Sequence, residues 1–221
     1  METIHNKQLI EDIYKYDVII YGMGINNAMN NGILYDIALN FPEVKDSEDC
    51  TGYGDMRKYG NIHEIKISGG LIFCACYCYD VGLKNKNNSF IVYDFLKSCL
   101  KQVCKKYKRK KIASPIIGCS PYDGNGDKEK IISIYNEMFS DGYDITLYDV
   151  DQQDFKKERY KEAVALRKKY IDGEITKKEF FELRKINEWK RLNGIFKEMP
   201  DDFEYTPCRK SKSKITIKKA K

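Results

Sequence analysis

Short runs of β-branched and aromatic residues alternate with amphipathic segments along the first 150 residues of the chain. Such a run, when bounded by Gly, Asn or Pro, predicts a strand, whereas apolar residues three and four positions apart predict a helix. Strands are expected at residues 3–10, 16–21, 61–67, 71–79, 112–117 and 143–149. Helices are expected at residues 32–41, closed by Pro42, and at 90–107 and 128–139. This alternation predicts an α/β fold with a mainly parallel sheet between helical layers.

Two glycine-rich loops follow strands in this pattern. The first begins with Gly22-Met23-Gly24, and the second covers residues 118–127. Ligand crevices of parallel sheets lie at the carboxyl ends of the strands, where both loops are expected. Loops of this kind offer backbone N–H groups and a positive helix end to a phosphate, so two side by side suit a diphosphate. Glycine-rich turns also serve packing alone, and both interpretations stay open. The polar segment 44–59 is expected to be a surface excursion.

The last third of the chain has a different pattern. Residues 155–171 are expected to be helical, and Asp172-Gly173-Glu174 is expected to form a turn. Thr176 and Glu179 have the spacing of a capping box that starts a helix running to about residue 192. The turn resembles half of an EF-hand loop, but Lys168 and Tyr170 stand where calcium requires carboxylates. We therefore expect three parts: a domain at 1–150, a basic helical hairpin at 155–195, and a basic, disordered tail at 196–221.

Charge separates these parts. Residues 151–221 hold 21 of the 39 Lys and Arg residues but only 13 of the 33 Asp and Glu residues. The tail is therefore strongly positive, whereas residues 1–150 are slightly negative. A basic tail favours contact with a polyanion such as nucleic acid, and a solvated helix face with a frayed end explains it equally well.

The cysteine pattern favours buried thiols. Cys74, Cys76 and Cys78 alternate with Ala75 and Tyr77, which places the three thiols on one face of a strand. Zinc sites prefer a CxxC turn, and the chain has only two histidines to help, so no metal site is expected. No segment has the roughly 18 consecutive apolar residues that span a bilayer. We expect a cytoplasmic protein with no membrane partner; its oligomeric state stays open.

Seven short segments of the first 150 residues carry a resemblance to a known family: Glu11-Asp12-Ile13, residues 17–20, 24–26, 29–33, 41–44, 114–119 and 145–148. Their order and spacing resemble a macro domain, in particular the divergent group related to ADP-ribosyl glutamate hydrolases and ADP-ribose 1''-phosphate phosphatases. The resemblance covers residues 3–150 and implies a three-layer α/β/α domain around a mixed sheet. It also implies that the chain binds ADP-ribose without a cofactor. The C-terminal helical pair is similar to short oligomerisation modules of the SHOCT type.

The resemblance implies roles for individual residues. Asp12 would accept a hydrogen bond from the adenine amino group, and Asn26 would orient the distal ribose or an attacking water. As alternatives, Asp12 is a short acidic turn residue and Asn26 a turn former. Tyr148 would stack on a ring, or it belongs to the core. Gly24, Gly32 and Ile33 would line the first phosphate loop, and Gly118, Cys119, Gly124 and Gly126 the second.

The sequence also departs from the family pattern. Asn30 stands where a glycine is usual, and the run 74–78 lacks the lysine with which the glutamate-specific hydrolases attack the sugar. Asp123 is the candidate catalytic acid or base, with Asp127 as its substitute, although capping is the more common role of an Asp before a helix.

Three functions are consistent with the sequence. The first is binding of ADP-ribose or a derivative with hydrolysis at the distal ribose, as a phosphatase or in de-ADP-ribosylation. The second is a non-catalytic reader or sequestering protein for such a nucleotide. The third is non-specific nucleic-acid association through the turn 108–111 and basic residues near the C-terminus, without base readout.

Overall fold

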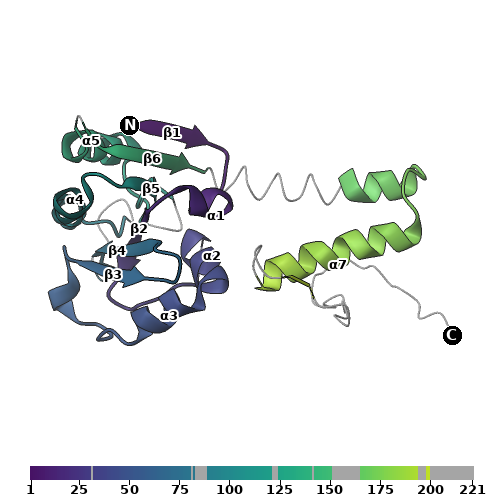
Figure 1. Ribbon diagram of the computed structural model, residues 1–221, viewed down its shortest axis with the longest axis horizontal. Coiled ribbons are helices and arrows are strands. Elements are labelled where there is room, and N and C mark those ends of the chain that lie inside the picture. The colour runs from purple at the N-terminus through teal and green to yellow at the C-terminus, as the bar shows by residue number, and fades with distance from the viewer. Residues whose placement is uncertain are drawn as a thin grey trace. The chain divides into compact units, whose positions relative to one another are not determined.

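The computed structural model describes residues 1–30, 32–80, 82, 89–120, 124–140, 142–150, 165–193 and 198–199. The chain divides into two compact units, residues 1–165 and residues 166–221. Figure 1 shows the ribbon of the chain. The expected basic tail near the C-terminus lies outside the described residues.

A six-stranded sheet forms the centre of the first unit. The strand order is β1-β6-β5-β2-β4-β3, and every neighbouring pair is parallel except β3 with β4. The expected strands are confirmed, but the first is shorter than predicted because a helix starts at Leu9. The strands are β1 Glu2–His5, β2 Val18–Gly24, β3 Ile62–Lys66, β4 Ile72–Tyr79, β5 Lys111–Pro115 and β6 Asp144–Asp149.

Helices cover both faces of the sheet (Figure 1). The helices α1 Leu9–Asp12, α2 Gly32–Asn40 and α3 Pro42–Asp49 share one core with Ile19, Tyr21 and Phe73 of the sheet. The helices α4 Tyr93–Tyr107 and α5 Lys128–Met138 share a second core with Ile20 and Cys74. Successive residues of a strand, such as Ile19 and Ile20, thus point to opposite faces of the sheet and pack in different cores. This confirms the predicted three-layer α/β/α architecture around a mixed sheet.

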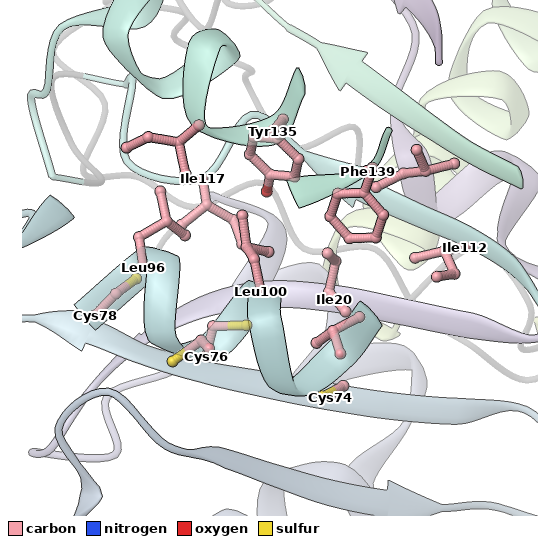
Figure 2. Packing of buried hydrophobic residues seen from close by; sticks show 14 of the residues in the cluster. Ile20, Cys74, Cys76, Cys78, Leu96, Leu100, Ile112, Ile117, Tyr135 and Phe139 are labelled. Atoms are coloured by element: carbon pink, nitrogen blue, oxygen red, sulfur yellow. The ribbon is translucent and has the colours of Figure 1, made fainter. Parts of the chain in front are cut away.

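The three alternating thiols lie in the second core. Cys74, Cys76 and Cys78 of β4 are each 0% exposed and none forms a disulfide. Figure 2 shows them packed with Leu96 and Leu100 of α4. The predicted burial of the three thiols on one strand face is therefore confirmed.

One predicted loop and one predicted boundary were wrong. Helix α2 ends at Asn40, before Pro42, as predicted, but Pro42 also occupies the first turn of a further helix, α3, where its missing N–H costs nothing. The segment 44–59 is therefore not wholly a surface excursion, and Glu48 in it is fully buried. Helix α4 begins at Tyr93, three residues later than expected, because Ile91 forms a β-bridge with Tyr79.

The second unit contains helical residues 166–171 and the helix α7 Lys177–Asn193. The predicted capping box is confirmed: the Thr176 N–H donates to Glu179 Oε2 at 2.7 Å, and the Glu179 N–H donates to Thr176 Oγ1 at 3.2 Å. The rings of Tyr170 and Phe180 stack with their centroids 5.0 Å apart. The hairpin as a whole stays a prediction. None of the described helices is long and apolar enough to cross a membrane.

Candidate functional site

The two glycine-rich loops start side by side at the carboxyl ends of two neighbouring strands of the sheet. Strands β2 and β5 are parallel neighbours, so the loop after Gly24 and the loop after Pro115 leave the sheet at the same edge. A Cβ atom on Gly22 would lie 2.2 Å from the Tyr79 hydroxyl oxygen and 2.6 Å from Ile117 Cγ2. The ends of β2 and β4 and the start of the second loop are therefore in close contact, and only glycine fits at position 22.

The first loop connects β2 to α2. The sheet register shifts between Met23 and Gly24, where β2 ends. Asn26 is half-buried, and its Oδ1 accepts a hydrogen bond from the Ala28 N–H at 3.4 Å, a turn-forming contact. Gly32 begins α2 with a φ of 51°, a conformation that favours glycine, and Ile33 packs at the edge of the core. The turn-forming alternative for Asn26 thus has a structural basis, and its ligand role stays a prediction.

Asn27, which the sequence pattern did not single out, anchors this loop. The residue is buried and has a φ of 53°, which Asn tolerates better than most residues. Its Nδ2 donates to the carbonyl oxygens of Glu48 and Thr51 at 2.9 and 3.1 Å. Its Oδ1 accepts from Lys58 Nζ at 2.6 Å. The first loop is therefore attached to the segment that follows α3.

The second loop folds back on itself. Gly118 and Gly124 have φ values of 83° and 102°, and a Cβ atom on Gly124 would lie 2.8 Å from the Gly118 Cα. The Gly126 N–H donates to the Gly118 carbonyl at 2.7 Å. A Cβ atom on Gly126 would approach Ile91 Cγ2 to 2.6 Å. These glycines are required for packing whether or not a phosphate binds, and the half-exposed Cys119 lies among them.

Of the two acidic candidates in the second loop, Asp123 and Asp127, the structure describes only Asp127. Asp123 lies outside the described residues. Asp127 is the N-cap of α5, and its Oδ1 accepts from the Lys130 N–H at 3.1 Å. The Asp127 N–H in turn donates to the Tyr93 hydroxyl at 2.9 Å. Asp127 therefore has the capping role that was the alternative to catalysis.

Asp12 and Tyr148, two further candidates, contact each other. The Tyr148 hydroxyl donates to Asp12 Oδ2 at 2.9 Å, and Lys7 and Lys15 each place Nζ 2.6 Å from an Asp12 oxygen. Burial by itself would raise the pKa of Asp12, but hydrogen bonds from Lys15, Lys7 and Tyr148 outweigh it and lower this pKa to about 2. Asp12 is thus an ionised carboxylate at neutral pH.

Tyr148 belongs to the core. Its side chain is 2% exposed, and its hydroxyl also lies 2.9 Å from that of Tyr16. Burial, followed by the contacts with Tyr16 and Asp12, raises the pKa of Tyr148. The Tyr148 carbonyl accepts from the Ile116 N–H at 3.2 Å, which attaches the end of β6 to the start of the second loop. The core alternative for Tyr148 thus has a structural basis, and stacking on a ligand stays a prediction.

A second polar cluster lies on the same face of the sheet as α3, around Glu48. Its carboxylate is 0% exposed and accepts hydrogen bonds from the hydroxyls of Tyr21 at 3.1 Å and Tyr77 at 2.6 Å. His63 Nδ1 lies 3.3 Å from Glu48 Oε1. Burial raises the pKa of Tyr77 beyond its ordinary range, and the neighbouring Glu48 adds to this. The sequence did not predict this cluster, because Glu48 lies in α3 among mostly polar residues and nothing local marks it as buried.

Within the described ranges, no group of three or more His, Cys, Asp or Glu side chains is placed to hold a metal ion.

Comparison with solved structures identifies the fold. A protein of unknown function from Bacteroides thetaiotaomicron aligns at 18% identity with a TM-score of 0.57, over 67% of this chain and 98% of that chain. The macrodomain of Thermus aquaticus DarG aligns at 10% identity with a TM-score of 0.50, over 67% and 99%. Thermosipho africanus DarTG, solved in complex with ADP-ribose, aligns at 13% identity with a TM-score of 0.54, over 69% of this chain and 42% of that chain.

No protein-family model and no curated protein sequence matches the chain. At the identities above, structural likeness establishes the fold alone, and it agrees with the strand order and the three layers. The first unit of this chain therefore has a divergent macro-domain fold.

Proposed function

We propose that the first unit binds ADP-ribose or a close derivative in the region where the two glycine-rich loops leave the sheet. The observation that carries this proposal is the parallel pairing of β2 with β5, which brings both loops to one edge. Each loop leads into the first turn of a helix, α2 at Gly32 and α5 at Lys128. Two helix N-termini with glycine-rich approaches suit the two charges of a pyrophosphate.

Asp12 is proposed to receive the adenine end of the nucleotide. Its lowered pKa keeps the carboxylate ionised, as an acceptor for the adenine amino group requires. A carboxylate has about four acceptor positions. Lys7, Lys15 and Tyr148 occupy three of them, which leaves room for one further donor. Asp12 is 5% exposed, so adenine would reach it at the edge of the core.

The distal ribose is proposed to lie near Gly24 and Asn26, at the other end of the pair of loops. Gly118, Cys119, Gly124 and Gly126 would then face the diphosphate. The ligand class is supported by Thermosipho africanus DarTG, a structural neighbour solved with ADP-ribose. Hydrolysis at the distal ribose is the proposed chemistry, with Asn26 orienting water and Asp123 acting as acid or base.

A non-catalytic reader is the second candidate, and two observations favour it. The segment Cys74–Cys78 of β4 supplies buried thiols and no lysine nucleophile. Asp127, the substitute acid, is used as a helix cap. A reader needs only the loops and the adenine contact.

Calorimetry on the full chain tests binding. ADP-ribose is titrated into the wild type, Asp12→Asn and the control Asp144→Asn. Asp144 is an exposed residue at the start of β6, whereas Tyr148, the partner of Asp12, lies near the end of that strand. We expect saturable binding that Asp12→Asn weakens about tenfold, the value of one charge-assisted hydrogen bond, and that Asp144→Asn leaves unchanged. No heat of binding with ADP-ribose, in protein shown to be folded, would remove the proposal.

Product analysis then separates the enzyme from the reader. ADP-ribose 1''-phosphate and an ADP-ribosylated protein are incubated with the wild type, Asn26→Ala and Asp123→Ala. Turnover that both substitutions abolish while ADP-ribose still binds supports hydrolysis. Tight binding of ADP-ribose with neither substrate turned over supports the reader.

A further inference from the structure

A pocket lies beside the outer strands β4 and β3, and its lining residue Lys58 also contacts Asn27 of the first glycine-rich loop. Its volume is about 390 Å³, and its lining includes Thr51, Lys58, His63 and Tyr77. In the strand order, β2 and β5 carry the two loops, whereas β4 and β3 carry this pocket. None of the residues predicted to contact the nucleotide lines it. The proposed nucleotide contacts therefore do not account for this pocket.

Lys58 brings a positive charge to this pocket with neutral partners. Its Nζ donates to Asn27 Oδ1 at 2.6 Å and to Thr51 Oγ1 at 2.5 Å, and it lies 4.9 Å from the centroid of the Tyr77 ring. The ion pairs of the described residues include none for Lys58. Burial lowers the pKa of this half-buried ammonium group, and the charges of Glu48 and Asp55 oppose that effect. An ammonium group has three donors, so one is left for a ligand.

The other basic residue that lines the pocket, Arg57, already forms an ion pair with Asp55. Arg57 donates to both carboxylate oxygens of Asp55, with Nε at 2.9 and 3.1 Å and Nη2 at 2.8 Å. Those hydrogen bonds lower the pKa of Asp55 to about 2, so the pair stays charged on both sides. Lys58 is therefore the cation on this lining whose direct hydrogen-bond partners, Asn27 and Thr51, are neutral.

His63 adds a directional group. Its Nδ1 edge faces the buried Glu48 carboxylate at 3.3 Å, and 28% of the side chain is exposed. A histidine whose Nδ1 is held by a carboxylate has a fixed ring orientation, so that Nε2 points away from Glu48. The Tyr21 hydroxyl donates to the same oxygen, Glu48 Oε1, and the Tyr77 hydroxyl donates to Oε2. This arrangement fixes an imidazole edge at the pocket.

We propose that this pocket binds a small anionic group, a phosphate or a carboxylate, with Lys58 as its charged contact and the Nε2 edge of His63 as its directional contact. The Thr51 hydroxyl lies on the same lining, accepts from Lys58 and donates to the Glu48 carbonyl at 2.6 Å, so it holds the Lys58 ammonium group in place. The proposal stands on the residues that line this pocket, none of which is among those proposed to contact ADP-ribose.

Nuclear magnetic resonance of the histidine rings tests this proposal directly. The chain has two histidines, so the imidazole Cε1–H region holds two assignable signals, one for each ring. His5 is the internal reference, because its side chain is 65% exposed and pairs with Asp149 of β6, far from β3 in the strand order. Inorganic phosphate, and acetate in a separate series, are titrated into the full chain at constant pH and ionic strength.

We expect the His63 signal to move along a saturable curve while the His5 signal stays in place. Tighter binding of phosphate than of acetate identifies a phosphate site, and the reverse order identifies a carboxylate site. Lys58→Met is expected to weaken binding about tenfold, because it removes the charged donor. Lys58→Arg keeps the charge and should retain binding. The control Lys66→Met makes the same change on β3 outside the pocket and should have no effect.

Two results would overturn the proposal. One is parallel, unsaturated movement of both histidines, which indicates a general salt effect. The other is unchanged affinity in Lys58→Met. If Lys58→Met loses the folded amide spectrum, His63→Gln replaces it, with the backbone amide signals of Thr51 and Tyr77 as the readout. His63→Gln is then expected to weaken binding, and binding equal to the wild type contradicts the assigned contact.

Discussion

The Tyr148 hydroxyl donates a hydrogen bond to the Asp12 carboxylate at 2.9 Å, and so joins the last strand of the sheet to its first helix. Residues 136 positions apart thereby share one buried polar contact. The same Tyr148 accepts the Ile116 N–H through its backbone carbonyl. Asp12 is consequently fixed next to the loop that is proposed to hold phosphate.

Removing this hydroxyl should destabilise the first unit. Tyr148→Phe leaves Asp12 with its two lysines but without a buried donor, and we expect a loss of about 1 kcal/mol in the free energy of unfolding. Urea denaturation followed by circular dichroism measures it. Tyr53→Phe, at a side chain that is 80% exposed, is the control and should change nothing. Equal stability of Tyr148→Phe and wild type would show that the contact contributes no net stability.

Asp12 should make the fold sensitive to acid. Its pKa is lowered from 3.8 to about 2, so the unfolded chain takes up the proton more readily than the folded chain. The stabilisation that the ionised Asp12 carboxylate provides is therefore present above pH 4 and is lost as the pH falls towards 2. Its full size is about 2 kcal/mol, reduced by the solvent screening of the exposed lysine partners. Unfolding free energies of wild type and Asp12→Asn should converge between pH 4 and pH 2. Curves that stay parallel would contradict the assignment.

Glu48 should be among the most sensitive positions of the fold. Glu48→Leu leaves the buried hydroxyls of Tyr21 and Tyr77 without their acceptor, and we expect a loss of about 3 kcal/mol. Guanidinium denaturation of the full chain measures the change. Glu43→Leu, an exposed position on the same helix, is the matched control, and Glu48→Gln should lose less because it keeps an acceptor oxygen. A loss no larger than that of Glu43→Leu would refute this view of the cluster.

Thiol labelling should follow burial. Cys50 is exposed and Cys119 half-exposed, whereas Cys74, Cys76 and Cys78 are buried. Contacts with Cys74 and Cys99, together with burial, raise the pKa of Cys76 and make its reactive thiolate scarce. In a Cys208→Ser background, Ellman's reagent should modify Cys50 first, then Cys119, and the buried thiols only after unfolding. Rapid modification of Cys76 in the folded protein is the contrary outcome.

The sequence pattern was sufficient to predict the sheet and its layers. Alternation placed Cys74, Cys76 and Cys78 on one face, and the spacing of Thr176 and Glu179 predicted a capping box, because both signals are local. Helix α3 was missed because its residues are mostly polar and its only fully buried residues are Val44 and Glu48. A helix with so narrow an apolar stripe has no clear periodicity.

The candidate site was predictable only in part. Local glycine patterns indicated where loops leave the strands, and parallel pairing brought those loops together. Long-range partners were not predictable: nothing near Asn27 in sequence indicates that Lys58 and the Glu48 carbonyl bind it. Nor does the pattern distinguish a glycine needed for a ligand from one needed for packing, as at Gly118 and Gly124.

The antiparallel strand β3 ends the sheet on one side, where an unpaired backbone would invite a strand from another molecule. Glu64 of this strand contacts Tyr107 and Lys106, so its charge is held against α4. Alternating charged residues such as Glu64 and Lys66 make this border a poor template for intermolecular pairing. We therefore expect association of two molecules through β3 to be disfavoured.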